Sequence, residues 1–380
     1  MSTGPHTGQA AADVLTFGET MLAAQLPEPL AIGAEARTTI AGAESNVAIG
    51  LARLGHRAAW ACLVGDDEPG RLILRTLRGE GVDTAHAGVR PEAPTGGMLR
   101  ERRVADLVRV HYWRRHSAAS LLAPADLAPA LHAGARILHL TGITCALGPG
   151  PLEAVREAAA HAHAHGWTVV LDVNHRQRLW TAEDAGKALL PLLEHVTVLI
   201  ASDDELSVVT GAFAEQPHGE ETAVDALLAA GVREVVVKRG GAGAAFCDRD
   251  GSRYAVPALR VPVRDTVGAG DAFCAGYLSG LLDGLPPDGR LDRANTLGAF
   301  AVASDGDWEG LPRRDELGLP PPPRAPRSAD PPTTTGAPHH DRSGALGRTG
   351  PPGAGRGHPL GRRPARLRRH PHRPPAHPGR

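Results

Sequence analysis

Short runs of apolar, often β-branched residues alternate with amphipathic segments along the chain as far as Leu319. Six apolar runs are expected to form strands, and they begin at Val14, Ala59, Arg136, Thr168, Val196 and Arg233. Within each run the apolar residues follow one another instead of alternating with polar ones. This pattern is typical of parallel strands that are buried on both faces.

The amphipathic segments predict helices over residues 44–55, 68–81, 151–166 and 221–231, and each segment closes on a glycine. Glycine is common just after the last turn of a helix. Strands and helices in alternation require crossover connections, so the pattern predicts an α/β fold with a doubly wound, mainly parallel sheet. Residues 95–113 break the alternation, because two strand patterns follow one another without a helix between them. We expect a small separate sheet there.

Composition divides the chain into three parts. Of its 380 residues 42% are apolar, which is enough for a substantial core and excludes a mini-protein. We expect a disordered N-terminus over residues 1–12, one folded domain over 13–319, and a disordered tail over 320–380. The tail holds 16 of the 33 prolines and 12 arginines, but no Val, Ile, Met, Phe, Tyr or Trp. Such a segment cannot build a core.

Two interpretations of the tail remain open. Its composition is what GC-rich codons give when they are read out of frame, so a shifted reading frame near Leu319 is one interpretation. The other is a basic arm that contacts nucleic-acid phosphates. No aromatic residue is interleaved for base stacking, which disfavours the second interpretation, and we expect no specific nucleic-acid partner.

Several protein classes are disfavoured by what the chain lacks. No apolar run reaches the roughly 20 residues that cross a bilayer, and the first residues resemble no signal peptide. We therefore expect a cytoplasmic protein without membrane contact. The four cysteines are far apart and form no CxxC pair, so they are expected to be buried and reduced. Without a GxGxxG turn in a first βαβ unit, a nicotinamide enzyme is disfavoured.

The segment DTVGAGD, which begins at Asp265, carries the clearest chemistry. Its glycine-rich turn runs into an apolar helix, so the amides of Gly268, Ala269 and Gly270 are left open to an anion at the positive end of the helix. Asp271 follows them, where a carboxylate can take a proton from a hydroxyl that attacks a phosphoryl group. The alternative role for Asp271 is a helix cap, but a cap alone does not require the glycines.

At this point the sequence resembles the ribokinase-like (PfkB-type) carbohydrate kinases. Residues 265–271 match their DTxGAGD signature, and AGAESNVAIGLARLG over residues 41–55 matches their other signature, a glycine-rich turn followed by Asn on a helix. The resemblance implies a Rossmann-like main domain and a small β-sheet lid, with lid elements near residues 20–42 and 95–115. It also implies ATP and Mg²⁺, a small-molecule sugar substrate and a homo-oligomer, and it leaves a requirement for a monovalent cation open.

Three further segments resemble the 2-keto-3-deoxygluconate kinases of that family: HYWRRHSAAS from His111, DVNHRQRLW from Asp172 and GDWEGLP from Gly306. By that resemblance the sugar acid would contact residues of the lid, the main domain and the C-terminal part, namely Gly42, Asn46, Tyr112, Arg114, Arg176 and Asp307. The chemistry agrees, because the arginine fork suits a carboxylate. The alternative is that Arg114 and Arg176 are solvated surface charges.

The resemblance also assigns the nucleotide side. It implies that ATP lies along residues Ser202, Lys238, Gly241, Gly243 and Asn295. Glu205 matches the acidic end of the family's NxxE magnesium motif, but the first position of that motif is Ser202 here instead of Asn. Glu205 is therefore either a metal ligand or a solvated glutamate in the first turn of a helix.

Together these features predict an enzyme that transfers phosphate from ATP to the primary hydroxyl of 2-keto-3-deoxy-D-gluconate, giving 2-keto-3-deoxy-6-phosphogluconate and ADP. Asp271 would be the base, and the amides of residues 268–270 would stabilise the transferring phosphate. Two alternatives remain. One is a related kinase of the fructokinase or ribokinase type, and the other is a sugar-binding regulator without catalysis.

Overall fold

The computed structural model describes residues 11–104 and 107–319. The chain divides into two units, residues 1–325 and 326–380, and all described residues belong to the first. The predicted disordered tail lies outside the described residues, as do residues 1–10 of the predicted disordered N-terminus. Ala12 already opens the first strand.

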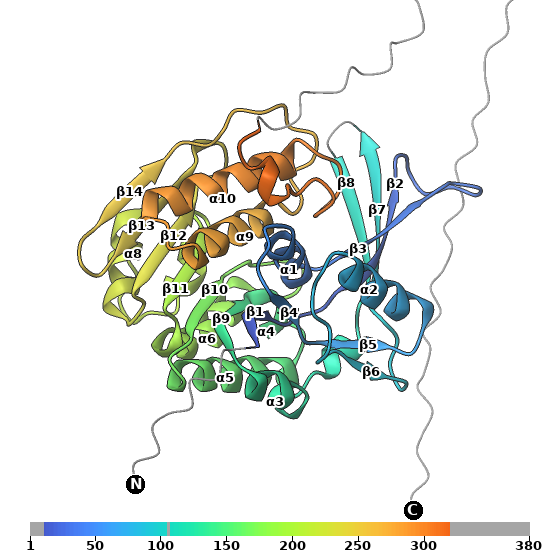
Figure 1. Ribbon diagram of the computed structural model, residues 1–380, viewed down its shortest axis with the longest axis horizontal. Helices are drawn as coiled ribbons and strands as arrows, with labels where there is room; N and C mark the ends of the chain where they lie inside the picture. The colour runs from blue at the N-terminus through green and yellow to red at the C-terminus, as the bar shows by residue number, and fades with distance from the viewer. Residues whose placement is uncertain (1–10, 105–106, 320–380) are drawn as a thin grey trace, which may run out of the picture. The chain divides into compact units, whose positions relative to one another are not determined.

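An eight-stranded sheet forms the centre of the domain, in the order β14-β13-β12-β11-β10-β9-β1-β4 (Figure 1). The six strands from β12 to β4 are parallel, and β13 and β14 add an antiparallel hairpin at one edge. The predicted α/β class with a mainly parallel sheet is confirmed. The strands are β1 Ala12–Thr16, β4 Ala58–Trp60, β9 Ala135–Thr141, β10 Thr168–Asp172, β11 Val198–Ser202, β12 Glu234–Lys238, β13 Ala244–Asp248 and β14 Arg253–Val256.

Helices cover both faces of this sheet, with α1, α9 and α10 on one side and α5, α6 and α8 on the other (Figure 1). All four predicted helices are present, and the glycine after each one, at 55, 81, 166 and 231, has a positive φ. The helices are α1 Ala43–Arg53, α2 Glu68–Gly79, α3 Pro124–Ala133, α4 Gly142–Cys145, α5 Pro149–Ala164, α6 Ala182–Leu189, α7 Leu206–Thr210, α8 Glu220–Ala229, α9 Ala269–Leu282 and α10 Pro287–Val302. Short 3₁₀ turns are η1 Ala118–Leu121, η2 Leu190–His195, η3 Gly240–Ala242 and η4 Arg314–Glu316.

A second, four-stranded sheet, here called the lid sheet, stands beside the main sheet in the order β3-β2-β7-β8 (Figure 1). Its strands are β2 Met21–Leu26, β3 Arg37–Ala41, β7 Gly97–Val104 and β8 Leu107–Trp113. The last two form the antiparallel pair that the sequence pattern indicates for residues 95–113.

One predicted strand was wrong in extent. The apolar run from Ala59 to Gly65 does not form one strand, because β4 ends at Trp60 and the chain then leaves the main sheet. Its second half is β5 Leu63–Gly65, which pairs with β6 Gly88–Arg90 in a separate two-stranded sheet. Both halves are buried and apolar, so the sequence pattern carries no mark of the break.

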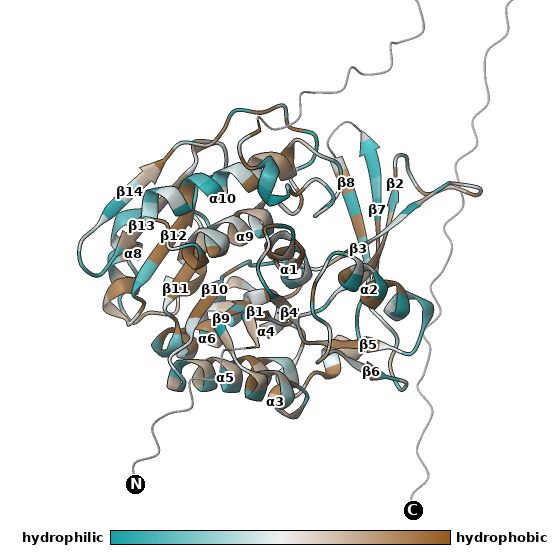
Figure 2. Cartoon of the chain, viewed as in Figure 1, coloured by the Kyte–Doolittle hydropathy of each residue, from teal (hydrophilic) through white to brown (hydrophobic). Residues whose placement is uncertain are grey.

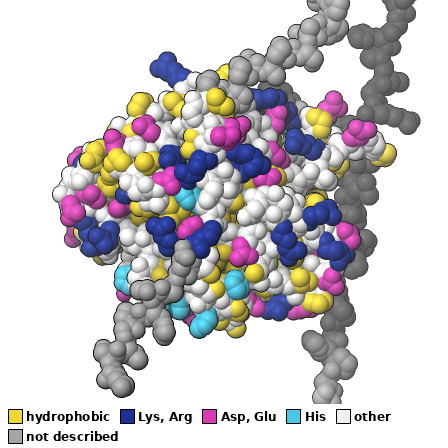
Figure 3. All heavy atoms as spheres, viewed as in Figure 1, with side chains coloured by type: hydrophobic (Ala, Val, Ile, Leu, Met, Phe, Trp, Pro, Cys, Tyr) yellow, Lys and Arg dark blue, Asp and Glu magenta, His cyan; other side chains and the backbone are white. Residues whose placement is uncertain are grey.

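The core lies between the main sheet and its two helical layers, and Figure 2 shows hydrophobic residues along strands of the main sheet. All four cysteines are buried and free, as predicted. On the face that Figure 3 shows, acidic and basic side chains lie interspersed. Among the described residues, no helix is long and apolar enough to span a membrane.

Candidate active site

The predicted anion hole lies at the amino end of α9, close to the carboxyl ends of the parallel strands. Gly268 caps the helix in the left-handed conformation, with φ at 75°. A Cβ added there would lie 2.0 Å from the carbonyl oxygen of Asp307, so backbone conformation and space both require glycine. The first amides of α9 lack partners within the helix and carry its positive dipole, which makes this end suited to an anion.

Asp271 is 5% exposed, and both oxygens of its carboxylate accept hydrogen bonds from side-chain amides. Asn46 of α1 donates to Oδ2 at 2.8 Å, and Asn174, which follows β10, donates to Oδ1 at 3.2 Å. Burial raises the pKa of Asp271, although the charge of Arg176 and the bond from Asn46 oppose the rise. The two amides therefore orient a carboxylate that is buried at the positive end of a helix.

Lys238, the last residue of β12, lies beside the anion hole. A Cβ added at Gly270 would have the Nζ of Lys238 as its nearest neighbour, at 3.6 Å. The same Nζ lies 2.7 Å from Oδ1 of the buried Asp172. Burial by itself would lower the pKa of Lys238, but nearby negative charges, with Asp172 first among them, and the hydrogen bond to Asp172 together outweigh burial, and the pKa is raised. The lysine is therefore held as a cation next to the place where a phosphate would lie.

The predicted sugar-acid arginines differ in their surroundings. Arg176 is exposed, and its charge acts on Asp271. Arg114, which follows the lid sheet, is only 12% exposed in its side chain and lies 2.6 Å from Oε2 of the fully buried Glu19. Its guanidinium also lies 5.7 Å from the ring centre of Tyr112. Arg114 is thus neutralised by an acid that the sequence analysis did not consider.

The other predicted sugar contacts lie where separate segments meet. Gly42 caps α1, and a Cβ there would lie 2.5 Å from the carbonyl oxygen of Glu19. Asp307 is buried, and its Oδ1 accepts from Arg100 of β7 at 2.7 Å. Burial raises the pKa of Asp307 to about 7, although Arg100 opposes the rise.

Comparisons with known proteins identify the family of the chain. A model of the pfkB family carbohydrate kinases matches residues 11–314. The chain belongs to the pfkB family of carbohydrate kinases. This kinase is 35% identical over 317 residues to 2-dehydro-3-deoxygluconokinase from Thermoproteus tenax, with 82% of the chain and 94% of the relative covered. It is 34% identical over 316 residues to the enzyme of that name from Bacillus subtilis, with 80% and 94% covered.

The fold of this kinase also matches solved structures. A PfkB protein from Polaromonas sp. JS666 superposes with a TM-score of 0.72 at 36% identity, covering 82% of this chain and all of the other. The resemblance that the sequence motifs indicated is therefore confirmed at the level of family and fold.

The residues predicted for the nucleotide lie along one edge of the kinase's site. Gly243 has a φ of 99°, and a Cβ there would lie 2.0 Å from the carbonyl oxygen of Val256. Gly241 lies in η3 with open space around it. Asn295 of α10 donates to the carbonyl oxygens of Val256 and Pro257 at 3.3 and 3.2 Å. It therefore anchors the start of the loop that leads to the anion hole.

Glu205, the predicted metal ligand, has a backbone hydrogen bond on each oxygen of its carboxylate. Its oxygens accept the backbone N–H groups of Ser202 at 2.8 Å and His175 at 2.7 Å. Oε2 also lies 3.8 Å from the Nζ of Lys238. Within residues 11–104 and 107–319, no group of three or more His, Cys, Asp or Glu side chains could hold a metal ion. In this arrangement Glu205 connects the ends of neighbouring strands.

Four residues at the site were missed by the sequence analysis: Glu19, Arg100, Asp172 and Asn174. Asp172 and Asn174 lie inside the quoted DVNHRQRLW segment, so a polar D-x-N at the end of a buried strand was the available signal. Asn174 donates to Asp172 at 3.1 Å as well as to Asp271, and its φ of 40° is rare for a residue with a side chain. Glu19 and Arg100 are paired with residues far away in the sequence, which no local pattern shows.

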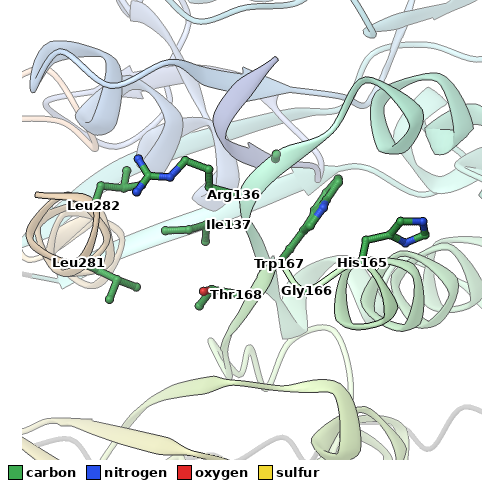
Figure 4. Close-up of a pocket in the computed structure, with 9 residues that line it drawn as sticks. Arg136, Ile137, His165, Gly166, Trp167, Thr168, Leu281 and Leu282 are labelled. Carbon is green, nitrogen blue, oxygen red and sulfur yellow. The ribbon is translucent and has the colours of Figure 1, made fainter. Parts of the chain in front are cut away.

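A cavity of about 520 Å³ lies at the opposite end of the main sheet (Figure 4). It is formed by the amino ends of β9 and β10 and the last turn of α9, and its lining includes Arg136, His165, Trp167 and Leu282. None of the predicted site residues lines it. The predicted residues Asp271, Ser202 and Lys238 lie instead near the carboxyl ends of the strands, where ligands bind in open α/β sheets.

Proposed function

We propose that this kinase transfers the γ-phosphoryl group of ATP to the primary hydroxyl of 2-keto-3-deoxy-D-gluconate, the sugar acid also called 2-dehydro-3-deoxy-D-gluconate. The products would be 2-keto-3-deoxy-6-phosphogluconate and ADP. The observation that carries the proposal is the Asp271 carboxylate, held by two amides beside the anion hole and Lys238. Family membership and the two relatives named above support the choice of reaction.

In this mechanism Asp271 accepts the proton of the primary hydroxyl as that oxygen attacks phosphorus. The new O–P bond forms while the bond between the γ-phosphorus and the bridging oxygen breaks, and ADP leaves with that electron pair. The amides of Gly268, Ala269 and Gly270 face the charge that develops on the phosphoryl oxygens. Lys238 supplies a positive charge next to them, because Asp172 keeps it protonated.

Specificity for a sugar acid would rest mainly on Arg176. Arg114 and Glu19 form an ion pair and carry no net charge together, so Arg114 offers directed N–H groups but little long-range attraction. Arg176 is the exposed cation that can meet the substrate carboxylate. Tyr112 and Asp307 would contact the sugar from the lid side and the C-terminal side, and Gly42 and Asn46 would line the floor.

The nucleotide would lie along Ser202, Gly241, Gly243 and Asn295, with its phosphates directed toward Lys238. Gly241 leaves the backbone of its turn open to a phosphate chain, and Gly243 lets the end of that turn pack against the carbonyl oxygen of Val256. Among the described residues the chain itself builds no cluster of metal ligands, and Glu205 is occupied by backbone amides. We expect Mg²⁺ to arrive bound to the phosphates of ATP, whose negative charge it would neutralise.

An ATP-coupled assay tests the substrate directly. The panel contains 2-keto-3-deoxygluconate, its galacto epimer, gluconate, fructose and ribose. We expect the highest kcat/KM with a 2-keto-3-deoxy sugar acid. A preference for fructose or ribose would refute the sugar-acid assignment, and sugar binding without turnover would favour the regulator.

Substitution of Arg176 tests the basis of specificity. Arg176→Leu should raise KM for the sugar acid about tenfold to hundredfold, because losing a hydrogen bond to a charged group typically costs about 1.5–3 kcal/mol. KM for ATP should stay close to its starting value. Arg75→Leu, on the exposed side of α2, is the control. Arg114→Leu is less informative, because it would leave Glu19 buried without its partner.

A further inference from the structure

A buried arginine connects the lid sheet to both loops that support the anion hole. Arg100 of β7 has a side chain that is 7% exposed and lies between two carboxylates. Its Nη1 donates to Oδ1 of Asp307 at 2.7 Å, and its Nη2 donates to Oδ2 of Asp265 at 2.9 Å. One planar guanidinium therefore joins three segments that are far apart in the sequence.

Asp265 and Asp307 both help to fix the position of Gly268. The second oxygen of Asp265 accepts the backbone N–H of Val267 at 3.1 Å, which shapes the turn just before Gly268. The backbone carbonyl of Asp307 lies against Gly268 so closely that a Cβ there would be 2.0 Å away. Moving either acid would therefore displace the turn whose amides form the anion hole.

We propose that Arg100 is a positioning residue that couples the lid sheet on the sugar side to the anion hole on the phosphate side. The proposal rests on the proposed function, since it takes the lid sheet as the cover of the sugar. With the lid sheet in this position, Arg100 holds Asp265 and Asp307 together and so holds the turn around Gly268. If the lid sheet moves away, both acids lose their shared cation.

The chemistry of the side chain explains why an arginine stands here. Its fork presents N–H groups in two directions in one plane, so it can hold two carboxylates at once. A lysine at this position would keep the charge but, with one compact ammonium on a flexible stem, would not fix both acids in place. Among the described residues, no group donates to Oδ2 of Asp307. Arg100 thus takes one oxygen of Asp307 and leaves the other for a sugar hydroxyl.

The test compares Arg100→Lys and Arg100→Met with the matched control Arg102→Met, an exposed arginine two residues further along β7. We expect kcat/KM for the sugar to fall about tenfold to hundredfold in both Arg100 variants, the usual effect of losing a charged hydrogen bond. KM for ATP should change by less than about twofold, because Arg100 contacts no residue of the nucleotide side. Arg102→Met should behave as wild type.

Hydrogen–deuterium exchange of the full-length protein adds a readout that needs no substrate. The amide of Val267 is the one bonded to Asp265, so it should exchange faster in both Arg100 variants and not in Arg102→Met. Wild-type exchange at Val267 in Arg100→Lys would overturn the proposal whatever the value of kcat/KM, because a positive charge without the planar fork would then suffice to hold the turn. If Arg100→Met fails to fold, the measurements on Arg100→Lys alone test the proposal.

The same measurements separate this inference from the proposed function. If the wild-type enzyme prefers another sugar, the proposed substrate fails, and the Arg100 variants are then measured with that sugar. If no sugar is phosphorylated, the exchange rate at Val267 decides alone. Unchanged exchange would refute the coupling whatever the substrate is.

Discussion

At the scale of single residues, the environment of Asp271 determines what its carboxylate can do. A buried carboxylate is costly unless hydrogen bonds or charges compensate it. Here each oxygen accepts one amide N–H, from Asn46 and Asn174, which fixes the plane of the group without neutralising it. Neither amide can take a proton from a substrate, so in the proposed mechanism the base is Asp271.

Asp271→Asn should separate binding from chemistry. The amide keeps the size of the side chain but cannot act as a base, so kcat should fall by about 10²–10⁴-fold, the usual contribution of a general base. ATP and sugar should still bind, measured by calorimetry, and the melting temperature should stay close to that of wild type. The control is Asp288→Asn, an exposed acid in the first turn of α10, which removes a helix-end charge without touching the site. Near wild-type turnover in Asp271→Asn would leave only the helix-cap role.

The same scale shows where sequence analysis stopped. The place of Asp271 and the three residues before it, at a turn that enters a helix, could be predicted because it depends on neighbours along the chain. Their catalytic roles stay a prediction. The ion pair of Arg114 with Glu19 could not be predicted, since it depends on how the lid sheet packs against the end of β1. A charged residue can be recognised in a sequence, but its partner is set by the tertiary structure.

At the scale of elements, α9 connects the interior of the protein to the anion hole. The helix is apolar on all sides and packs between α1 and α10, with Gly276 so close to α10 that a Cβ would lie 2.7 Å from the Cα of Ala294. Such a helix cannot shift easily in a close-packed interior. Its first turn is therefore a rigid support for the amides that would face a phosphate in the proposed mechanism.

The two ends of α9 provide a matched test of this idea. Gly268 and Gly284 both have positive φ, at 75° and 72°, but only Gly268 has backbone atoms where a Cβ would go. Gly284→Ala should cost about 1–2 kcal/mol of stability, the price of the left-handed conformation, and leave kcat unchanged. Gly268→Ala should in addition reduce kcat by about 10²–10³-fold, the loss typical of removing an anion-hole donor. Equal kcat values in the two variants would contradict a role for the turn at Gly268.

Helices and strands could be predicted where the sequence pattern of a segment matched its burial in the folded domain. The predicted strands and helices of the parallel sheet are present because continuous burial and glycine stops are visible in the sequence. The antiparallel hairpin β13–β14 was missed, although Asp250-Gly251 between its strands is a typical hairpin turn, and Gly251 has a φ of 87°. The break after Trp60 could not be seen, because both halves of that run are equally apolar.

At the scale of the whole molecule, the candidate site forms because several strands of the main sheet end next to the start of α9. The carboxyl ends of β10, β11 and β12 bring Asp172, Ser202 and Lys238 together, and α9 approaches them with Asp271. The lid sheet adds Arg100 from another part of the chain. This convergence follows from the doubly wound topology, which places the ends of all parallel strands at one edge.

The same view predicts that the tail contributes nothing to the fold or to catalysis. The last backbone hydrogen bond of the described chain joins the N–H of Leu319 to Glu316 at 2.9 Å. Ending the chain at Leu319 therefore keeps every contact described above. The removed segment holds 12 arginines and no Val, Ile, Met, Phe, Tyr or Trp. The melting temperature should stay within about 2 °C, since changes away from packed contacts are typically within about 0.5 kcal/mol.

A shorter truncation is the control for this experiment. Ending the chain at Pro312 would also remove Arg314, which lies 2.8 Å from Asp283, and Leu317, which packs on the core. That variant should lose stability, whereas the variant ending at Leu319 should keep wild-type kcat and KM. If the tail were instead a nucleic-acid arm, only the full-length protein would bind DNA, and the binding would weaken steeply with salt. Loss of activity on removing residues 320–380 would refute the view that the kinase domain is complete at Leu319.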